Sequence, residues 1–491
     1  MERWRLEVDG IGMEKKEKCG LIGAYSSKGF DIVPAILQGL EALQHRGQES
    51  WGFTVEGRPV FRKMGLVASW RLDSEEIAAS YHGPSGIGHV RYSTKGKSTI
   101  ENAQPIEIEN EFSIAHNGTI MNADSLAPQV LEEFETSCDS DTMVAGYRLL
   151  HHLRDTGSMF EAIERLSVEI RGSYCFVILS AEGGVFAVRD PRGYRPLSIG
   201  WHEETGTLIA ASESCALESL GAQFVRDVEP GEMVKFGGLE DTLGSYRFAP
   251  KMDTAYCSFE YTYFAHPSSR LNGVSVYEAR KNVGRILARN LKTRADIVVP
   301  VPDSARPAAL GFALESGIPM DEGLMKDRYR SKGSIRSFIE PEQGTREDVV
   351  RRIVPIRGAV DGKDVILVDD SLVRGTSSRI IVESLKKAGA KSIRMAVTFP
   401  PIRHPCFMGI DFPDRKELLA HQVAAGEQDS VSTAAKVAEA IGVEEFYYND
   451  TKGLSEAMGL PESSLCFACV TGDYSKLEIQ SPLLEEKGAR V

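Results

Sequence analysis

The stretch Asp364-Val-Ile-Leu-Val-Asp-Asp-Ser-Leu-Val-Arg-Gly-Thr-Ser-Ser378 decides the fold expected for the second half of this 491-residue chain. Its first residues form an apolar run typical of a short buried strand, which ends at the adjacent acids Asp369 and Asp370. A turn rich in small hydroxyl residues follows at 371–378 and leads into a helix at 379–388. Free N–H groups at a helix start bind phosphate, and carboxylates accept hydrogen bonds from sugar hydroxyls. The stretch therefore suits a phosphorylated sugar, whereas the plainer alternative is an ordinary strand–loop–helix unit with a solvated acid pair.

Strands and helices alternate through the rest of the second half. Residues 276–291 have the pattern of an amphipathic helix, and residues 297–301 and 393–399 have that of strands. This alternation predicts an α/β domain with a mainly parallel sheet, in which ligands bind beyond the carboxyl ends of the strands. Ser304 follows one such strand, so we expect it near the same edge as the acid pair.

The first half has a different pattern, in which short apolar runs predict many strands with helices between them. Strands are predicted at 86–90, 112–116, 173–179 and 184–188, and helices at 32–43 and 142–152. We place the boundary between the halves near 245–255, which gives domains at 19–250 and 251–480 and a tail at 481–491.

The overall charge limits the classes of partner. With 57 Lys and Arg against 70 Asp and Glu, the net charge is −13, which argues against a general nucleic-acid binder or a membrane-surface protein. No apolar run approaches the ~20 residues of a membrane helix. Residues 1–18 lack the apolar core of a signal peptide, so we expect a cytoplasmic location. Positive charge is concentrated at 326–357, which suits the steering of an anionic substrate.

Cys19 begins the first predicted strand, where a lone cysteine is more often a small buried side chain than a nucleophile. The motifs that follow it change this interpretation. They are Gln44-His-Arg-Gly-Gln48, Gly88-His-Val-Arg-Tyr-Ser-Thr94, Asn102-Ala-Gln-Pro105, Ala115-His-Asn-Gly118, Asp139-Ser-Asp-Thr142 and Asp190-Pro-Arg-Gly-Tyr-Arg-Pro-Leu197. In this order they resemble the class II glutamine amidotransferases, which implies an α+β domain of the N-terminal-nucleophile fold, with four αββα layers.

The resemblance implies a role for each residue of a glutamine site. Cys19 is the expected nucleophile, and its own α-amine, with a pKa of about 8, is the expected base. Asn117 and Gly118 are expected to form the oxyanion hole, Arg91 to bind the α-carboxylate of glutamine and Asp141 its α-ammonium. Taken singly, Arg91 and Asp141 also fit surface ion pairs, and Asn117-Gly118 also fits a turn.

This mechanism requires Cys19 to become the first residue of the chain. Residues 1–18 are then a propeptide that is cut after Lys18. Initiation at Met13 would shorten this leader without removing the need for cleavage, and the sequence does not decide between the two starts.

The stretch that ends at Ser378 resembles the motif with which type I phosphoribosyltransferases bind 5-phosphoribosyl 1-pyrophosphate (PRPP). Further matches are Ser258-Phe-Glu-Tyr-Thr-Tyr-Phe-Ala-His-Pro267, Val299-Pro-Val-Pro-Asp-Ser304, Lys326-Asp-Arg-Tyr329 and Arg336-Ser-Phe-Ile-Glu-Pro341. Over residues 19–474, the two halves together resemble the family of glutamine-dependent PRPP amidotransferases. The resemblance implies that ammonia from glutamine passes along a shielded path to C1 of PRPP and displaces pyrophosphate. The products would be 5-phosphoribosylamine, glutamate and pyrophosphate, in the first step of purine (IMP) synthesis by a pentosyltransferase.

The same resemblance implies the components of the PRPP site. PRPP is expected to contact Asp369, Asp370, Arg374, Gly375, Thr376 and Ser377, with its 5-phosphate on the turn 374–378. One Mg2+ is expected at Ser304, Asp369 and Asp370. A loop at 326–346 is expected to close over PRPP, but extra residues near 331–334 leave open which of its cations contacts pyrophosphate. The implied assembly is a homotetramer inhibited by purine nucleotides, with neither nucleic acid nor membrane as a partner.

The second half also holds four of the eight cysteines, which are Cys257, Cys406, Cys466 and Cys469. The last two form a C-x-x-C pair, and the other two are distant in sequence. Four thiolates suit either tetrahedral zinc or an iron–sulfur cluster, and the spacing does not separate the two. The resemblance implies a 4Fe–4S cluster with a structural and oxygen-sensing role. Cys138, Cys175 and Cys215 match no ligand motif, and we expect the latter two to be buried.

Two other functions fit parts of the chain. An amidotransferase with a different acceptor, as in relatives of glucosamine-6-phosphate synthase, leaves the PRPP-type stretch without a use. A PRPP-binding regulator built on a phosphoribosyltransferase domain predicts a DNA-binding module or a basic face, and the sequence has neither.

Overall fold

The computed structural model describes residues 19–92, 99–136, 140–238, 243–327, 353–410, 412, 414–424 and 430–477. The predicted propeptide 1–18, the tail 481–491, Cys138 and most of the loop 326–346 lie outside these residues.

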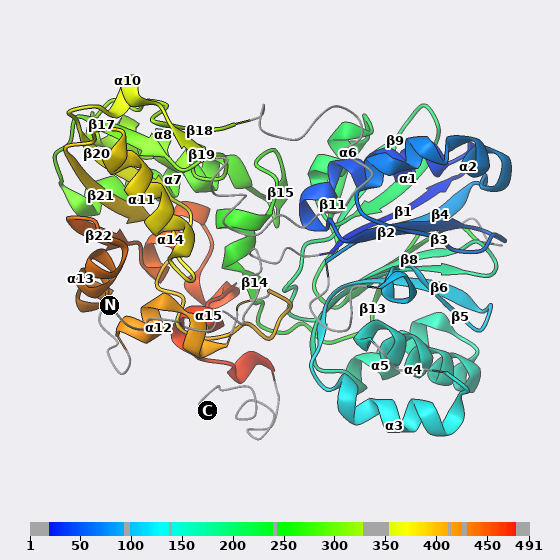
Figure 1. Cartoon of the computed structure of the whole chain (residues 1–491). Coiled ribbons are helices and arrows are strands. Elements are labelled where there is room, and N and C mark those ends of the chain that lie inside the picture. Colours follow the sequence, from blue (N-terminus) through cyan, green and yellow to red (C-terminus); the bar gives the residue numbers. More distant parts are fainter. Residues whose placement is uncertain are drawn as a thin grey trace, which may run out of the picture.

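The described part of the first half forms two antiparallel sheets that stack face to face, with helices on both outer sides (Figure 1). In spatial order, the seven-stranded sheet consists of β11 (Gln223–Asp227), β9 (Ser198–His202), β10 (Thr207–Ala211), β1 (Gly20–Ser26), β4 (Ser85–Arg91), β2 (Ser50–Val55) and β3 (Phe61–Met64). The six-stranded sheet consists of β13 (Gly244–Arg247), β12 (Glu232–Phe236), β8 (Val185–Arg189), β7 (Gly172–Ser180), β6 (Phe112–Ile120) and β5 (Ile106–Ile108).

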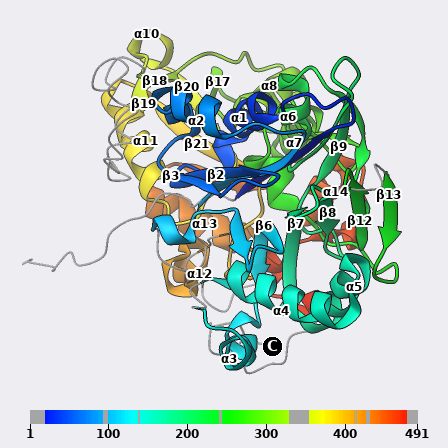
Figure 2. The ribbon, with the colours of Figure 1, turned by 90° about the vertical axis from the view of Figure 1, so that its right-hand side faces the viewer.

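Helices cover the outer face of each sheet, as the second view in Figure 2 also shows. The seven-stranded sheet packs against α1 (Val33–Ala42), α2 (Ser74–Ser80) and α6 (Ser214–Ser219). The six-stranded sheet packs against α3 (Ala123–Glu133), α4 (Asp141–Thr156) and α5 (Met159–Glu169).

The alternation of side chains along β7 explains these layers. Cys175 and Val177 point into the space between the sheets, whereas Phe176 and Ile178 point toward the helices under the second sheet. A strand that is apolar on both faces belongs inside a layered stack, because each face is covered by another element. The predicted αββα order is confirmed, and Cys175 and Cys215 are buried as expected.

The second half contains a four-stranded parallel sheet in the order β17 (Ile297–Pro300), β20 (Asp364–Asp369), β21 (Ser392–Val397) and β22 (Glu445–Tyr448). Along β20, Val365 and Leu367 pack toward α11 (Thr376–Lys387) and α13 (Ser430–Ile441). Ile366 and Val368 pack on the opposite face, toward α7 (Val276–Leu291) and α8 (Arg306–Ser316). The sheet is therefore buried on both faces, which confirms the predicted α/β domain.

Shorter elements complete the described part of the second half. The short strands form the pairs β14 (Tyr256–Cys257) with β23 (Leu465–Cys466), β15 (Arg270–Leu271) with β16 (Val274–Ser275), and β18 (Leu324–Lys326) with β19 (Ile353–Pro355). The short helices are α10 (Arg357–Val360), α12 (Leu419–Val423), α14 (Thr451–Met458) and α15 (Ala468–Thr471).

Two of the boundaries that differ from the sequence prediction affect the candidate sites. The helix after the acid pair begins at Thr376 instead of 379, because Gly375 adopts a left-handed conformation with φ 76° and starts the helix there. Small hydroxyl residues are common at a helix start as well as in turns, and the sequence pattern does not tell the two apart. Strand β6 is longer than predicted and includes Asn117 and Gly118, so the turn reading for these two residues is wrong.

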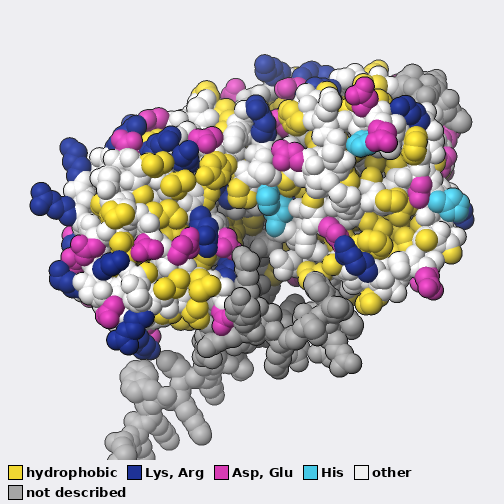
Figure 3. All heavy atoms as spheres, turned by 90° about the horizontal axis from the view of Figure 1, so that it is seen from above, with side chains coloured by type: hydrophobic (Ala, Val, Ile, Leu, Met, Phe, Trp, Pro, Cys, Tyr) yellow, Lys and Arg dark blue, Asp and Glu magenta, His cyan; other side chains and the backbone are white. Residues whose placement is uncertain are grey.

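The two halves lie side by side, with the parallel-sheet domain on the left of Figure 1 and the layered domain on the right. On the face drawn in Figure 3, basic and acidic side chains are interspersed among apolar ones over both halves. In the described ranges, no helix combines the length and the apolar character needed to cross a lipid bilayer.

Candidate active site

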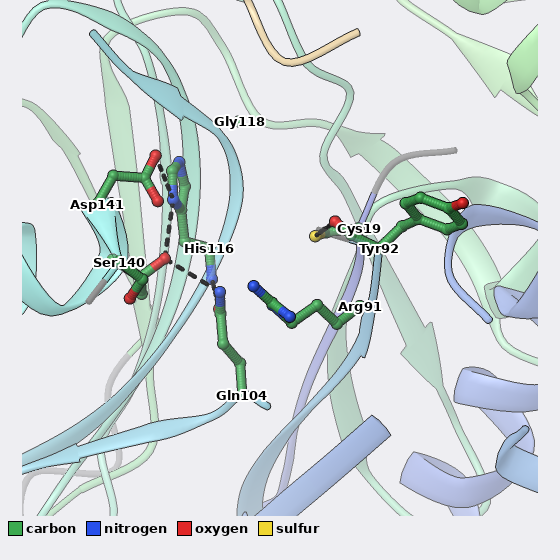
Figure 4. Close-up of a pocket in the computed structure, with 9 residues that line it drawn as sticks. Cys19, Arg91, Tyr92, Gln104, His116, Gly118, Ser140 and Asp141 are labelled. Carbon is green, nitrogen blue, oxygen red and sulfur yellow. Dashed lines mark hydrogen bonds and ion pairs between the residues drawn. The ribbon is translucent and has the colours of Figure 1, made fainter. Parts of the chain in front are cut away.

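The first candidate site is a pocket at the start of β1 (Figure 4). Its lining residues are Cys19, Arg91, Tyr92, Gln104, His116, Gly118, Ser140, Asp141 and Thr142. Cys19 and Arg91 lie on one side of the pocket and face Asp141 and His116 on the other. The structure thus brings together four of the five residues expected at a glutamine site, and the fifth, Asn117, is the neighbour of Gly118 on β6.

Cys19 is held in place from both its side chain and its backbone. Its Sγ donates to the carbonyl oxygen of Tyr92 at 3.6 Å, and its own carbonyl accepts from Nε of Arg46 at 3.1 Å. Burial raises the pKa of the Cys19 thiol above its ordinary value, while the Tyr92 bond and the charge of Arg91 act in the opposite direction. The thiol is therefore a poor nucleophile until a base takes its proton.

Asn117 and Gly118 provide polar hydrogens next to the pocket. Among the described residues, Nδ2 of Asn117 is buried and has no hydrogen-bond partner. A buried amide donor without a partner is unfavourable in the free protein, and an oxyanion at this position would supply the missing acceptor. Gly118 has φ 152°, and a Cβ placed on it would lie 2.0 Å from the carbonyl oxygen of Ser173, so only glycine fits this position.

The two charged residues expected to hold the substrate are buried, with Arg91 3% and Asp141 7% exposed. The surface ion-pair reading is therefore wrong for both. Asp141 is the first residue of α4, and its Oδ2 accepts from the backbone N–H of Ile120 at 2.9 Å. Nη1 of Arg91 lies 4.0 Å from the carboxylate of Glu49. A cation and an anion on opposite sides of one pocket suit an α-amino acid, which carries both charges on one carbon.

Sequence reasoning did not assign roles to three residues that brace this pocket. Oε1 of Gln104 accepts from the backbone N–H of His116 at 2.7 Å, and its Nε2 donates to Oγ1 of Thr142 at 3.0 Å. Nδ1 of His116 lies 3.2 Å from the same hydroxyl. Burial lowers the pKa of His116, so its ring is neutral and acts as a hydrogen-bonding strut. All three residues belong to the quoted motifs, and this was the feature of the sequence that could have identified them.

The second candidate site lies at the carboxyl end of the parallel sheet. Oγ of Ser304 donates to Oδ2 of Asp370 at 2.5 Å, and Oγ of Ser371 donates to Oδ1 at 2.7 Å. The Asp370 N–H donates to Oδ1 of Asp369 at 2.8 Å. Ser304 reaches the acid pair because β17 and β20 are neighbours in parallel register, with Pro300 opposite Val368. The predicted meeting of Ser304 with the acids is therefore observed.

The residues expected to hold the 5-phosphate begin α11. Gly375 precedes the helix, and Thr376 and Ser377 are its first two residues, so their N–H groups belong to the unsatisfied end of a helix. Arg374 lies just before them, but its Nε donates to Oε2 of Glu417 at 2.7 Å, so the structure places this side chain in an ion pair.

The four cysteines of the second half converge although they are distant in sequence. Cys257 and Cys466 are opposite each other in the β14–β23 pair, and Cys469 lies in α15. The Cys469 carbonyl accepts from the N–H groups of Arg403 and His404 at 3.0 Å, which brings the Cys406 segment to the same place. Burial, together with the neighbouring thiols, raises the pKa of Cys406 to about 11 and that of Cys466 to about 12. Thiols in this state bind a metal only by releasing protons.

A buried ion-pair network joins the halves next to Cys19. Arg46 donates to both oxygens of Glu260, at 2.9 and 3.1 Å, and also to Glu213. Arg195 donates to Oε1 of Glu260 at 3.0 Å. Burial lowers the pKa of Arg46, but the negative charges of Glu260 and Glu213 have the larger combined effect and raise this pKa above its ordinary value.

A second group at this interface, His45, Glu213 and Cys215, brings one ligand atom from each residue within 4.8 Å of the others. Glu213 already accepts from Oγ of Ser269 and from the N–H of His266, each at 2.7 Å, as well as from Arg46. Its oxygens are thus satisfied by protein donors, and we assign no metal to this group.

Comparisons with known proteins match both halves. Residues 89–219 match the glutamine amidotransferase domain family, and residues 275–406 match the phosphoribosyl transferase domain family. The amidophosphoribosyltransferase of Methanocaldococcus jannaschii is 40% identical over 484 residues, covering 93% of this chain and 97% of its own. That of Bacillus subtilis is 36% identical over 486 residues, covering 95% of each chain.

A solved structure matches over nearly the whole length as well. The glutamine PRPP amidotransferase from B. subtilis, in complex with ADP and GMP, has a TM-score of 0.79 and 36% identity, over 93% of this chain and 97% of that chain. Proteins that are this similar over most of their length share their fold and the order of their domains. Here the order is the layered domain with Cys19, followed by the parallel-sheet domain with the acid pair. The chain therefore belongs to the amidophosphoribosyltransferase family of enzymes.

Proposed function

We propose that this family member makes 5-phosphoribosylamine, with Cys19 releasing ammonia from glutamine and the acid pair Asp369 and Asp370 holding PRPP. The observation that carries this assignment is the pocket that brings Cys19 together with the buried charges of Arg91 and Asp141. A thiol, a cation and a carboxylate match the three reactive groups of glutamine, which are the amide carbon, the α-carboxylate and the α-ammonium.

In the first half-reaction, Sγ of Cys19 attacks the amide carbon of glutamine, and the thiol proton passes to the α-amine that cleavage before residue 19 frees. Nδ2 of Asn117 and the N–H of Gly118 stabilise the tetrahedral oxyanion. The C–N bond then breaks, the proton leaves with the departing ammonia, and water hydrolyses the thioester to glutamate. Arg91 and Asp141 hold the α-carbon of the substrate so that the amide carbon stays next to Sγ.

In the second half-reaction, ammonia attacks C1 of PRPP and the bond from C1 to the pyrophosphate oxygen breaks, while the nitrogen loses one proton. The start of α11, at Gly375, Thr376 and Ser377, holds the 5-phosphate on its free N–H groups. The carboxylates of Asp369 and Asp370 accept hydrogen bonds from the ribose hydroxyls. Arg374 is the sixth proposed contact, and it reaches the phosphate when its ion pair with Glu417 opens.

The oxygen donors at the acid pair fit Mg2+. Ser304 Oγ lies 2.5 Å from Asp370 Oδ2, and hydroxyl and carboxylate oxygens are the hard ligands that this ion takes. We assign Ser304, Asp369 and Asp370 to one Mg2+ per subunit, which when bound would neutralise charge on the pyrophosphate leaving group.

The four cysteines fit an iron–sulfur cluster better than a single zinc ion. A tetrahedral zinc ion with Zn–S bonds of about 2.3 Å needs sulfurs about 4 Å apart. Among the described residues, no three of these Sγ atoms lie within 4.8 Å of one another. We assign Cys257, Cys406, Cys466 and Cys469 to one 4Fe–4S cluster, which would tie both ends of the second half together.

The organisation of the chain follows from the same proposal. We place the glutamine domain at 19–250 and the PRPP domain at 251–480, since β13 ends at Arg247 and β14 begins at Tyr256. Residues 1–18 are the proposed propeptide. Regulation by purine nucleotides is supported by the Bacillus subtilis relative, whose solved structure contains ADP and GMP. The homotetramer and the cytoplasmic location stay predictions.

The test is to compare two nitrogen donors in Cys19→Ala. Pyrophosphate release from PRPP is measured with glutamine and, separately, with ammonium. We expect glutamine-dependent release to be lost and ammonium-dependent release to be retained. Cys175→Ala, at a buried cysteine outside the pocket, is the matched control and should keep both. If Cys19→Ala uses both donors as well as the unchanged protein does, the nucleophile is assigned wrongly.

A further inference from the structure

A segment of the PRPP domain touches the glutamine site directly. A Cβ placed on Gly409 would lie 3.1 Å from the backbone carbon and oxygen of Gly118 and 3.0 Å from Oγ1 of Thr119. Gly118 is the glycine beside the pocket at Cys19, whereas Gly409 comes three residues after Cys406. Backbone of the second half therefore packs on the backbone of Gly118 and beside the side chain of Thr119.

The segment around Gly409 is itself firmly held. The Met408 carbonyl accepts from Oγ of Ser173 at 2.8 Å and also from the guanidinium of Arg195. Ser173 is fully buried, and its own carbonyl oxygen lies where a side chain of Gly118 would otherwise be. The same serine therefore lies next to Gly118 and anchors the segment that packs against it.

Aromatic packing fixes the other end of this segment. The ring centroids of Phe407 and Tyr474 lie 4.9 Å apart, and the Tyr474 hydroxyl donates to the Pro405 carbonyl at 2.6 Å. Phe407 and Met408 are buried with Met121, which follows β6 in the glutamine domain. These contacts fix the chain at residues 405 to 408, immediately before Gly409, and so hold Gly409 against Gly118.

We propose that Gly409 is a positioning residue for glutamine hydrolysis, because it holds the oxyanion glycine Gly118 against Ser173 from the PRPP domain. This inference rests on the proposed function, since it assumes that Asn117 and Gly118 form the oxyanion hole. Donors of an oxyanion hole act only when they lie at hydrogen-bond distance from the developing charge, so a displacement of a few tenths of an ångström weakens them. The second half thus completes a site whose chemistry belongs to the first half.

Position 409 requires glycine for two reasons, which a control substitution at another glycine can separate. Its φ is 88°, which disfavours any other residue, and an added methyl would press on Gly118. Gly317, at the end of α8, has φ 75°, and no atom of the residues that the structure describes lies within 4 Å of a Cβ placed there. Gly317→Ala therefore introduces a similar backbone strain in the same domain without a contact to the glutamine site, and it is the matched control.

The experiment measures kcat and KM for glutamine, and kcat with ammonium, at saturating PRPP. For Gly409→Ala we expect kcat with glutamine to fall about tenfold or more, with KM for glutamine and kcat with ammonium changed less than about twofold. Gly317→Ala should change none of the three. Alkylation of Cys19 by iodoacetamide needs no oxyanion hole, and its rate should be the same in Gly409→Ala and in the unchanged protein.

Ser173→Ala keeps the inference testable if Gly409→Ala does not fold. It removes the hydrogen bond to the Met408 carbonyl without adding volume, and kcat with glutamine should fall about three- to tenfold while ammonium use persists. The inference is overturned if these variants keep the full kcat with glutamine, or if they lose glutamine and ammonium use in parallel.

Asn117→Ala separates this inference from the proposed function. Loss of an oxyanion donor should lower kcat with glutamine about a hundredfold or more. If Asn117→Ala has no effect, the oxyanion assignment is wrong and the role of Gly409 fails with it. If Asn117→Ala has the expected effect but Gly409→Ala and Ser173→Ala do not, only the role of Gly409 is overturned.

Discussion

Arg46 of the glutamine domain and Glu260 of the PRPP domain form a doubly hydrogen-bonded ion pair, with N–O distances of 2.9 and 3.1 Å. Arg46 also donates to the carbonyl of Cys19 at 3.1 Å. The backbone of the nucleophile is therefore tied through one side chain to the other domain. Both side chains are buried, so the loss of either one leaves the other without this partner in the protein interior, which is strongly destabilising.

Glu260→Gln should destabilise the protein strongly. It removes the carboxylate that serves Arg46 and Arg195 together, and two buried guanidinium groups lose their shared counter-charge. Breaking a buried pair in this way costs about 3–5 kcal/mol. We expect a lower denaturant midpoint, measured by tryptophan fluorescence. Glu315→Gln, which removes the exposed partner of Arg289, is the control and should leave the midpoint unchanged. An equal midpoint in Glu260→Gln would contradict the prediction.

The alkylation of Cys19 should depend on pH in a definite direction. Because burial raises the pKa of this thiol, its thiolate fraction at pH 7 is below that of an ordinary cysteine and rises with pH. The positive charge of Arg91 lowers this pKa and the negative charge of Asp141 raises it. Iodoacetamide should therefore react with Cys19 about two- to tenfold more slowly at pH 7 in Arg91→Gln, and faster by a similar factor in Asp141→Asn. Mass spectrometry of the Cys19 peptide gives the rates, and a change in the same direction for both variants would refute this view of the site.

Asp370→Asn should abolish the use of both nitrogen donors. Asp370 accepts from Ser304 and Ser371, and Asn offers only one oxygen in place of two. Pyrophosphate release with glutamine and with ammonium should fall about a hundredfold or more, and Asp369→Asn should behave alike. Glu383→Gln, an exposed acid on the helix that follows, is the control and should be normal in both assays. Undiminished turnover in the Asp variants would show that PRPP does not bind at this edge of the sheet.

Replacing one of the four converging cysteines should release the metal. Cys406→Ser and Cys466→Ser should lose iron and the brown absorbance near ~400 nm expected of iron–thiolate clusters, whereas Cys175→Ser should keep both. Because buried thiols with pKa values of about 11 and 12 must lose protons to bind metal, retention should decrease as the pH falls. Anaerobic purification followed by metal analysis provides the measurement. A colourless protein with stoichiometric zinc would contradict the cluster.

The sequence predicted the elements that have a local hydrophobic pattern and the site residues that belong to compact motifs. The apolar run at 173–179 predicted the strand β7, and α7 lies at the predicted 276–291. Arg91 and Asp141 were named because they belong to ordered motifs, and Cys19 because those motifs follow it; the fold brings all three to one pocket. The periodicity of a strand reports only which of its own faces is buried, and not which residue lies opposite.

Contacts between distant segments were not predictable in this way. Glu260 lies within a quoted match, Ser258 to Pro267, but nothing in that match identifies Arg46 as its partner. Gly409 is one of 46 glycines, and only the packing of the two domains shows that it touches Gly118. The start of α11 was misplaced because small hydroxyl residues favour turns and helix starts alike.

The contact between Gly118 and Gly409 bears on how hybrids of these enzymes inherit activity. Exchange of a whole glutamine domain between relatives would separate the two glycines and pair each with a surface that evolved beside another partner. Such a hybrid can fold, bind both substrates and still hydrolyse glutamine slowly, since each domain keeps its own residues but loses the contact that positions Gly118. Crossover points that carry residues 405–409 along with the glutamine domain preserve this junction, and position 409 is inherited with the domain it touches.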